Sequence, residues 1–310
     1  MGWDGPVAND NTTGAVSGTA ADGTSVFEEH RPLLLGVAYR MLGRVADAED
    51  VVQEAWLRWS GADRAAVREP RAYLVRTTTR LAVDRLRQIA SRREAYVGPW
   101  LPEPLATDYG HTVEDAAERA MLSESVSLAV LVVLESLSPL ERAVFVLREA
   151  FGLPHAEIAG ILDRGEAAVR QLAARARRHV AERTPRFEAD PAQRRELTER
   201  FLAAAVEGDL DGLLAVLAPD ARLVGDGGGR AKAPLRTILG AGKVARFLAA
   251  ISQTPVPGLA VAPLELNGGP ALLATSEGRP YAALVPEAAD GLVQRVYIVS
   301  NPEKLAHLAR

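Results

Sequence analysis

The chain has 310 residues, of which 48% are hydrophobic and 25% charged, a composition typical of a soluble protein with two or three domains. It has no cysteine, which excludes disulfides, thiolate metal sites and cysteine nucleophiles, and its five histidines lack the spacing of metal ligands. The formal net charge of −4 disfavours a protein that binds DNA on its own, because such proteins are often basic, and favours one whose larger partner supplies part of the affinity.

The N-terminal segment, residues 1–24, is rich in small and polar side chains and lacks the basic start and apolar run of a signal peptide. We expect it to be a disordered tail. No later stretch approaches the ~18 consecutive apolar residues of a membrane span. We therefore expect a cytoplasmic protein that does not contact a membrane and that uses no metal and no cofactor.

Apolar residues recur at helical spacing through residues 25–94, which predicts an all-helical domain. After a break, Asp47 is placed to cap a helix over Ala48–Ser60, with Asp50 completing an imperfect capping box. Carboxylates gather near the start of this helix, and two tryptophans follow them. The acidic groups either only complement the helix dipole or meet a basic partner, and at least one tryptophan is expected in the core.

A third helix begins near Pro70, which suits the first turn of a helix, and carries arginines on its outer face. These arginines are either solvated or bound to the phosphates of a nucleic acid, and Tyr73 is the one aromatic side chain there on which a base could stack. Residues 95–112 follow as a semi-rigid linker, because glycine and prolines interrupt the pattern. Trp100 and Leu101 lie within this linker, where they are poorly placed unless another part of the chain covers them.

A second helical segment is predicted over residues 113–184 and ends in the pattern of a helix-turn-helix. Residues 163–165 break the first helix of this motif, and Gly165 is expected to take the left-handed conformation that a tight turn needs. Glu166 opens the second helix, whose inner face is predicted to hold Ala168, Val169, Leu172, Ala173 and Ala176. Its outer face is rich in arginine and glutamine, which suits the major groove of DNA, although an amphipathic hairpin with a solvated arginine face has the same pattern.

From residue 190 onward the pattern predicts an α+β domain. Helices are expected over Leu197–Val206, Leu210–Leu217 and Ile238–Ile251, with a glycine-rich loop at residues 226–230. Four short alternating runs follow, separated by turn sequences, and these predict antiparallel strands joined by hairpins. The loop lacks both a following Lys-Ser/Thr and the Rossmann spacing of glycines, so it is not a nucleotide cradle.

Together these motifs resemble the extracytoplasmic-function sigma factors of bacterial RNA polymerase over residues 25–184. Residues 47–59 resemble the helix with which this family binds the clamp of the polymerase β′ subunit, and residues 70–87 resemble the helix that melts and reads the −10 element. Residues 137–147 with the helix-turn-helix resemble the domain that reads the −35 element, and the resemblance also implies a contact with the β flap. The tail resembles a SnoaL-like cone, which one group of these sigma factors carries.

The resemblance implies four sets of functional residues. Core polymerase would be bound by Asp47, Glu49, Asp50, Gln53, Glu54 and Trp56. The −10 element would be contacted by Arg71, Tyr73, Arg76, Arg80, Arg85 and Arg87. The −35 element would be contacted by Glu166, Ala167, Arg170, Gln171, Arg175, Arg177 and Arg178. Regulatory contacts would be made by Trp100, Leu101, Pro102, Asp226, Gly227, Gly228, Gly229, Arg230, Asn301, Pro302 and Lys304.

Three positions depart from the family pattern. Arg80 stands where many members have Asn, so the −10 sequence is not implied, whereas Arg230 and Glu303 replace Lys and Asp and keep the charge. We expect the linker to dock on the tail near the glycine-rich loop, with residues 301–305 packed in the same region. Through that contact the tail would regulate the promoter-reading domains.

The implied fold is two all-α domains, the second with a helix-turn-helix, followed by an α+β SnoaL-like cone. The implied function is that of a non-catalytic sigma factor that binds core RNA polymerase and promoter DNA. An alternative is a fused protein whose cone is a cyclase- or isomerase-like enzyme or binds a small ligand. Cyclases of this fold use an Asp/His pair, whereas His307 is the only histidine of the tail, so acid–base chemistry lacks its usual carrier. A stand-alone helix-turn-helix repressor would not need the acidic helix and would be expected to dimerise on a palindrome.

Overall fold

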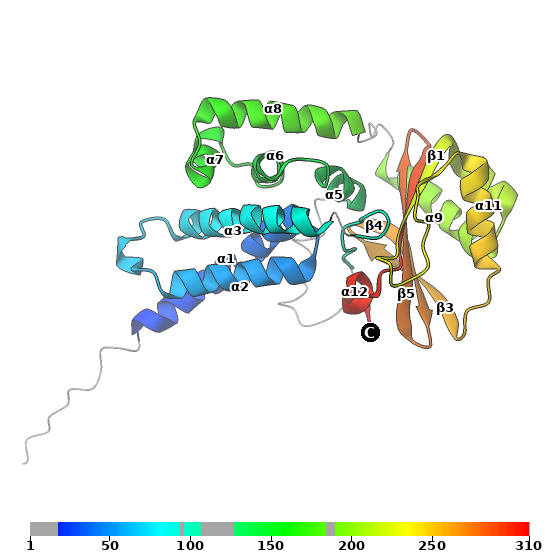
Figure 1. Cartoon of the computed structure of the whole chain (residues 1–310), viewed down its shortest axis with the longest axis horizontal. Coiled ribbons are helices and arrows are strands. Elements are labelled where there is room, and N and C mark those ends of the chain that lie inside the picture. The colour runs from blue at the N-terminus through cyan, green and yellow to red at the C-terminus, as the bar shows by residue number, and fades with distance from the viewer. Residues whose placement is uncertain (1–17, 94–95, 107–126, 184–189, 310) are drawn as a thin grey trace, which may run out of the picture.

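The computed structural model describes residues 18–93, 96–106, 127–183 and 190–309. A helical half and a sheet-containing tail lie side by side, and the short helix α12 (Pro302–Leu305) lies between them, close to the C-terminus (Figure 1). Parts of all five predicted segments lie outside the described residues, namely residues 1–17, residue 94, residues 95 and 107–112, residues 113–126 and 184, and residue 310.

The first helical unit consists of α1 (Gly18–Leu42), α2 (Val45–Ser60), the single turn η1 (Arg64–Ala66) and α3 (Pro70–Arg93). Helix α1 begins inside the segment expected to be disordered, so residues 18–24 are helical. The cap assigned to Asp47 is wrong, because α2 begins earlier and Arg44 is its N-cap residue, without a capping bond from its side chain. Asp47 lies instead in the first turn, where its charge favours the helix dipole.

The second helical unit consists of α5 (Leu128–Leu134), α6 (Pro139–Phe145), the π-helical turn η2 (Val146–Ala150), α7 (His155–Leu162) and α8 (Glu166–Arg183). A capping box starts α6, in which the side chains of Ser138 and Glu141 each bond the other's backbone amide. Helices α7 and α8 form the predicted helix-turn-helix. The turn conformation is a correction, because Asp163 and not Gly165 is left-handed, with φ of 56°, a conformation that short Asx side chains tolerate. Ala168, expected on the inner face of α8, is exposed.

The two helical units share one hydrophobic core. Buried side chains of α1, α2 and α3 belong to the same cluster as those of α6, α7 and α8. Arg142 of α6 links the units, because its Nη1 donates to the carbonyl oxygen of Met41 in the last turn of α1 at 2.7 Å. The same guanidinium pairs with Glu135 at 3.1 Å, so its charge is balanced inside the protein. A cation thus satisfies a carbonyl at the negative end of the α1 dipole.

The tail consists of α9 (Pro191–Glu207), α10 (Leu210–Val216), β1 (Leu217–Asp226), β2 (Ile238–Leu239), α11 (Ala241–Ser252), β3 (Leu259–Leu266), β4 (Gly269–Ser276), β5 (Arg279–Ala289), β6 (Leu292–Val299), α12 and the turn η3 (Ala306–Leu308). Its sheet has the order β2-β1-β6-β5-β4-β3. All neighbouring strands are antiparallel except β1 and β6, which are parallel. Helices α9, α10 and α11 pack their apolar sides against the sheet in a second core.

The prediction of this domain is right in class and wrong in two elements. The four predicted strands match β3 to β6, and their turns begin at Asn267, Glu277 and Asp290 with φ of 50°, 49° and 53° before a glycine with positive φ, as the twist of a two-residue hairpin requires. Strand β1 is absent from the prediction. The helix expected over Ile238–Ile251 is wrong at its start, because Ile238 and Leu239 pair with β1 and Gly240, with φ of 92°, separates them from α11.

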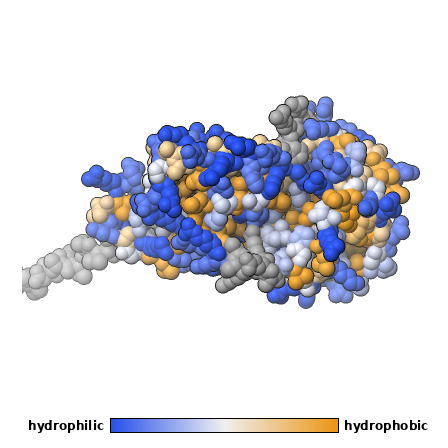
Figure 2. Space-filling view, turned by 45° about the horizontal axis from the view of Figure 1, so that its top comes forward, coloured by the Kyte–Doolittle hydropathy of each residue, from blue (hydrophilic) through white to orange (hydrophobic). Residues whose placement is uncertain are grey.

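A third hydrophobic cluster joins the linker and the second helical unit to the tail. Leu101 and Ala106 of the linker, together with Leu128 and Ala129 of α5, pack against buried side chains of β3 to β6 and η3. Ala106 also bridges Leu266 at the end of β3. Burial of apolar surface therefore fixes the tail relative to the helices. On the outside, Figure 2 shows hydrophilic side chains over much of one face, with hydrophobic patches between them.

Candidate functional site

Helix α2 presents acidic and amide side chains beside a hollow of about 450 Å³ between α1 and α2. The residues of α2 that line this hollow include four of the predicted set, Glu49, Asp50, Gln53 and Trp56. Trp56 is half-buried and contacts the ring of Phe27 edge to face, with centroids 4.9 Å apart. Glu54 is exposed on the same helix and pairs with Arg58 at 2.7 Å. Glu28 and Arg31 of α1 also line the hollow, so three carboxylates and one guanidinium surround its aromatic floor. This arrangement suits a partner that is basic overall.

Asp47 and Arg85, predicted to bind polymerase and DNA, bind each other. Asp47 is buried, and its Oδ1 accepts from Nε and Nη2 of Arg85 at 3.1 and 2.8 Å. Arg85 Nη2 also donates to the exposed Asp50 at 3.1 Å. Trp59 is the interior tryptophan of α2, and its Nε1 donates to the carbonyl oxygen of Gly23 at 2.8 Å. These groups hold α1, α2 and α3 together.

The remaining predicted residues of α3 fall into two groups. Arg71, Arg76 and Arg87 are exposed, whereas Tyr73 is half-buried and packs on Trp59 with ring centroids 5.7 Å apart. Arg80 lies against the second unit, where its Nε donates to the carbonyl oxygen of Ile161 in α7 at 2.8 Å. In this arrangement the helix-turn-helix therefore occupies one residue of the predicted −10 surface.

The predicted −35 residues lie together on α8, which runs along one edge of the molecule (Figure 1). All seven are exposed, namely Glu166, Ala167, Arg170, Gln171, Arg175, Arg177 and Arg178. Three of the arginines have acidic neighbours: Arg170 pairs with Glu166 at 2.5 Å, Arg175 with Glu141 at 3.6 Å, and Arg177 with Glu149 at 2.7 Å. Such exposed pairs contribute only about 0–1 kcal/mol each, so phosphates can replace the acidic partners.

The carboxylate of Asp226 is the centre of a buried junction between the linker and the tail. Its Oδ1 accepts from the hydroxyl of Tyr96 at 2.5 Å, and its Oδ2 accepts from the amide of Leu101 at 2.8 Å and pairs with Lys304 Nζ at 2.6 Å. Lys304 Nζ also donates to the carbonyl oxygen of Leu101 at 2.5 Å and lies 3.2 Å from the ring centroid of Trp100. Burial raises the pKa of Tyr96, and its bond to Asp226 raises it further, so the hydroxyl stays a donor.

The glycine-rich loop and the start of α12 close this junction. Gly228 has φ of 58°, and a Cβ there would come within 2.3 Å of Asn301 Nδ2, so glycine is required. Asn301 caps α12 and donates to the hydroxyl of Tyr96 at 2.9 Å. Arg230 pairs with Glu303 at 3.0 Å on the exposed side. Of the other predicted regulatory residues, Pro102 and Gly227 are buried and Gly229 is exposed. Pro302 is the first residue of α12.

Glu103 forms a second junction, where the linker meets α1, α2 and the C-terminal turn. Its amide donates to the carbonyl oxygen of Gly43 at 2.8 Å, and its carbonyl oxygen accepts from the hydroxyl of Tyr39 at 2.7 Å. Its side-chain Oε2 accepts from the amide of Val45 at 3.0 Å, and its Oε1 lies 2.8 Å from Nδ1 of His307. One linker residue therefore connects the tail to the start of α2.

Asn267, in the turn between β3 and β4, strengthens the same region. It exchanges bonds with the backbone of Leu105 at 3.0 and 2.7 Å, and its Nδ2 donates to the hydroxyl of Tyr39 at 3.1 Å. Sequence reasoning missed Tyr39, Tyr96, Asn267 and His307 because none belongs to a recognised motif. The one available signal is Tyr39, a polar tip within the apolar face of α1.

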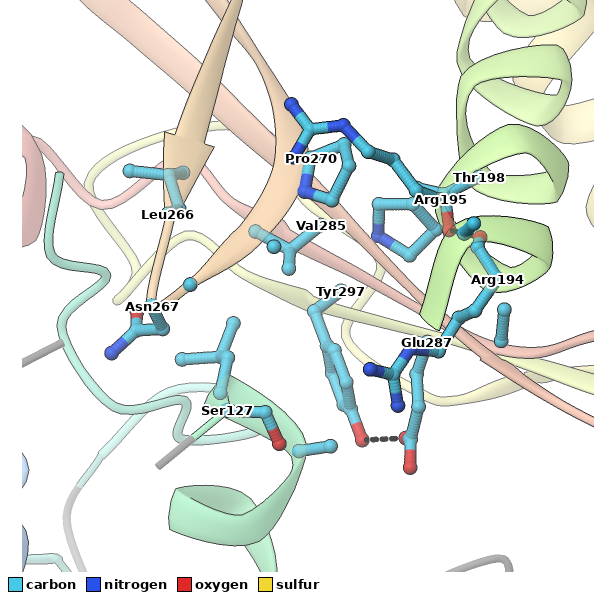
Figure 3. Close-up of a pocket in the computed structure, with 17 residues that line it drawn as sticks. Ser127, Arg194, Arg195, Thr198, Leu266, Asn267, Pro270, Val285, Glu287 and Tyr297 are labelled. Atoms are coloured by element: carbon cyan, nitrogen blue, oxygen red, sulfur yellow. Dashed lines mark hydrogen bonds between the residues drawn. The ribbon is translucent and has the colours of Figure 1, made fainter. Parts of the chain in front are cut away.

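The tail holds a cavity of about 450 Å³ where it meets α5 (Figure 3). Tyr297 and Glu287 lie next to each other in it, and the hydroxyl donates to the carboxylate at 3.0 Å. Arg194 and Thr198 of α9 and Ser127 before α5 line other sides. The volume suits a small ligand. Within the described part of the chain, no histidine lines this cavity.

Two further kinds of site are absent from the described residues. No group of three or more His, Asp or Glu side chains there is arranged to hold a metal ion. No helix among them combines the length and hydropathy needed to cross a membrane.

Comparison with known proteins places both helical units in one family. Residues 26–93 match the model of sigma-70 region 2, and residues 127–180 match the model of sigma-70 region 4. The "ECF RNA polymerase sigma factor SigJ" of Mycobacterium tuberculosis is 42% identical over 291 residues, which are 90% of this chain and 92% of that protein. The "Probable ECF RNA polymerase sigma factor SigI" of the same organism is 33% identical over 286 residues, which are 91% of this chain and 94% of that protein.

The similarity extends to structure and includes the tail. The crystal structure of SigJ from Mycobacterium tuberculosis matches with a TM-score of 0.74 and 39% identity, covering 91% of this chain and 98% of that chain. These findings confirm the predicted family and the predicted fold class of two helical domains followed by an α+β SnoaL-like domain. The chain belongs to the extracytoplasmic-function RNA polymerase sigma factors, which bind core RNA polymerase and direct transcription from specific promoters.

Proposed function

We propose that α2 binds the clamp of the polymerase β′ subunit, that α3 and α8 contact the −10 and −35 elements, and that the second helical unit meets the β flap. The acidic and aromatic lining of the hollow beside α2 supports the first contact. The row of exposed arginines on α8 supports the contact with the −35 element. As a subunit of RNA polymerase the protein would work in the cytoplasm.

The packed arrangement of the helical units is proposed to be a closed state. The two promoter elements lie roughly 25 base pairs apart, about 85 Å at about 3.4 Å per base pair, so the units that read them must separate. Arg80 cannot reach DNA while its guanidinium donates to Ile161 of α7. Opening would therefore release Arg80 and leave α8 free to bind the other element.

The tail is proposed to regulate this opening by holding the linker, without performing chemistry. The observation that carries the proposal is the buried Asp226, whose carboxylate bonds the linker at Leu101 and Tyr96 and pairs with Lys304 of α12. The linker connects the two units that must separate. A tail that binds one arrangement of the linker better than another shifts the population of open chains by that difference in free energy.

Run-off transcription with core polymerase tests this role in the full-length chain. Asp226→Ala removes the centre of the junction, and Trp100→Ala removes the ring beneath Lys304. Both variants should change transcription in the same direction, Trp100→Ala by less. Asp220→Ala, at an exposed position of the same strand, is the matched control and should behave as wild type. Equal transcription by all four proteins would leave the tail without a regulatory role.

The cavity in Figure 3 favours one second candidate, a tail that binds a small ligand. Its walls include Leu128 and Ala129 of α5, so a ligand there would touch the second helical unit as well as the tail. An enzymatic role has less support. The only histidine of the tail, His307, is paired with linker residue Glu103 rather than with a group in the cavity.

A further inference from the structure

We propose that Glu103 of the linker is the N-terminal cap of α2 and that His307 sets it in place, which makes Glu103 a positioning residue for the polymerase-binding helix. This inference rests on the proposed function of α2. It concerns a different contact from the Asp226 junction, because it links the last turn of the tail to the first turn of α2.

Helix α2 lacks a cap from its own neighbourhood. The first amides of any helix need acceptors, which a Ser, Thr, Asp or Asn at the N-cap usually supplies. The N-cap residue here is Arg44, whose side chain makes no such bond. Oε2 of Glu103 accepts from the amide of Val45, the first helical residue, at 3.0 Å. A carboxylate from the linker therefore stands where a local cap is missing, at the positive end of the helix dipole.

The backbone of Glu103 is held in register with the same helix. Its amide and carbonyl groups bond Gly43 and Tyr39, which lie just before α2 and in α1. Its side chain is 6% exposed, so the charge needs a partner inside the protein. The imidazole of His307, which is 25% exposed, packs against the carboxylate, with Nδ1 2.8 Å from Oε1.

Both ring nitrogens of His307 face oxygen atoms. Nε2 lies 2.7 Å from the carbonyl oxygen of Pro104, and Nδ1 lies beside the Glu103 carboxylate. The ring therefore touches two consecutive linker residues and restricts the position of the Glu103 side chain.

Other charged groups near this contact already have partners. Tyr39 of α1 donates to the carbonyl oxygen of Glu103, and burial raises the pKa of its hydroxyl. Lys304 of α12 and Asp226 of β1 pair with each other on the other side of the linker. The side chain that packs against the Glu103 carboxylate is therefore that of His307.

Amide hydrogen exchange in the full chain tests the cap at the bond itself. In wild type, the Val45 amide should be protected to within a few-fold of the Ala48 amide, which bonds the carbonyl oxygen of Arg44 within the helix at 3.1 Å. Glu103→Ala should lower Val45 protection about ten-fold, the effect of losing a helix cap. Glu103→Gln keeps an acceptor in the same place, so it should keep most of the protection.

The histidine has its own variant and control. His307→Ala should lower Val45 protection several-fold, while protection of Ala48 reports that α2 is folded. His179→Ala removes a histidine that contacts Ser136 in the second helical unit and should match wild type. Unchanged Val45 protection in either Glu103→Ala or His307→Ala would overturn the proposal.

Binding to core polymerase tests the positioning role separately. Glu103→Ala should bind core about three- to ten-fold more weakly, because the first turn of α2 leads directly into Glu49 and Asp50 of the proposed interface. If Val45 loses protection while core binding is unchanged, Glu103 does not position the helix for polymerase. If charge reversal on α2 itself leaves core binding unchanged, the proposed function of α2 is wrong. The role of Glu103 as a cap is then still decided by the hydrogen exchange of Val45.

Discussion

Replacement of Lys304 by methionine should release the linker from the tail. The Lys304 side chain is almost completely buried, at 1% exposure, and its ammonium group pairs with Asp226, whose side chain is at 0%. Methionine keeps much of the aliphatic chain that packs beside Trp100 but removes the charge. Asp226 then keeps only its bonds from Tyr96 and Leu101. A buried carboxylate is left without its counter-charge.

The size of the effect follows from this burial. Removal of one partner from a buried ion pair costs about 3–5 kcal/mol, and a desolvated cation over an aromatic ring adds up to about 2 kcal/mol. The two bonds that Asp226 retains offset part of the loss, so we expect about 3 kcal/mol. At about 1.4 kcal/mol per factor of ten, that is roughly a hundredfold increase in linker opening. By contrast, the exposed ion pair between Arg230, at the end of the glycine-rich loop, and Glu303 of α12 should contribute less than about 1 kcal/mol to holding the linker closed.

The absence of cysteine provides the assay. Leu101→Cys places a single thiol at a position that is 1% exposed, so its rate of reaction with a thiol reagent reports opening of the linker. Lys304→Met in this background should react roughly a hundredfold faster than the parent, and Arg230→Met less than about five-fold faster. If both variants react at the same rate, the buried pair does not hold the linker and the reasoning is refuted.

Three further predictions concern the helical units. Asp50→Arg with Glu54→Arg places like charges against a basic partner and should abolish co-purification with core polymerase; a folded double variant that co-purifies normally would contradict the role of α2. For α8, the variants are Arg170→Ala, Gln171→Ala and Arg175→Ala. Each should either relax the specificity for one base of the −35 element, with a loss of ~1–3 kcal/mol in binding free energy, or lower the salt dependence of binding. Normal run-off transcription by all three variants would exclude α8 as the helix that reads this element. Ser138→Ala should cost about 1 kcal/mol in urea unfolding at neutral pH. Because the bond from Ser138 chiefly lowers the pKa of Glu141, this difference should shrink as the pH falls through that lowered pKa, and an NMR titration of Glu141 should show a higher pKa in the variant.

Elements specified by nearby residues could be predicted, and those specified across the chain could not. The hairpin turns at Asn267, Glu277 and Asp290 depend on two residues each, and all three form as expected. Strand β1 contains Pro219 and Asp220, residue types that are typical of loops. Its partner strand β6 lies some seventy residues further along the chain, as the paired residues Leu223 and Val296 show. The cap of α2 could not be predicted from neighbouring residues, because Glu103, which accepts from the Val45 amide, lies 58 residues further along the chain.

The candidate sites show the same division. Exposed rows such as the arginines of α8 follow from helical periodicity, so the seven predicted residues do share a face. Asp47 has the sequence context of a surface carboxylate, yet it is buried and paired with Arg85, which lies 38 residues later in the chain. The partners of Asp226 at the linker, Tyr96 above all, lie 125 to 130 residues away and carry no motif. Resemblance located the linker residues 100–102, the glycine-rich loop and residues 301–305, and only tertiary structure could supply the other groups that join them.

If the helical units must separate as proposed, the core that they share ties the stability of the free chain to its activity. Each opening would expose apolar side chains of this core, so only a fraction of free molecules would be ready for the polymerase at any moment. The affinity measured for the polymerase is then the intrinsic affinity multiplied by that fraction. Substitutions that loosen the shared core would melt the free protein at a lower temperature and load it onto the polymerase more readily. Selection can therefore adjust the output of this sigma factor from its interior, without changing any residue that touches DNA or polymerase.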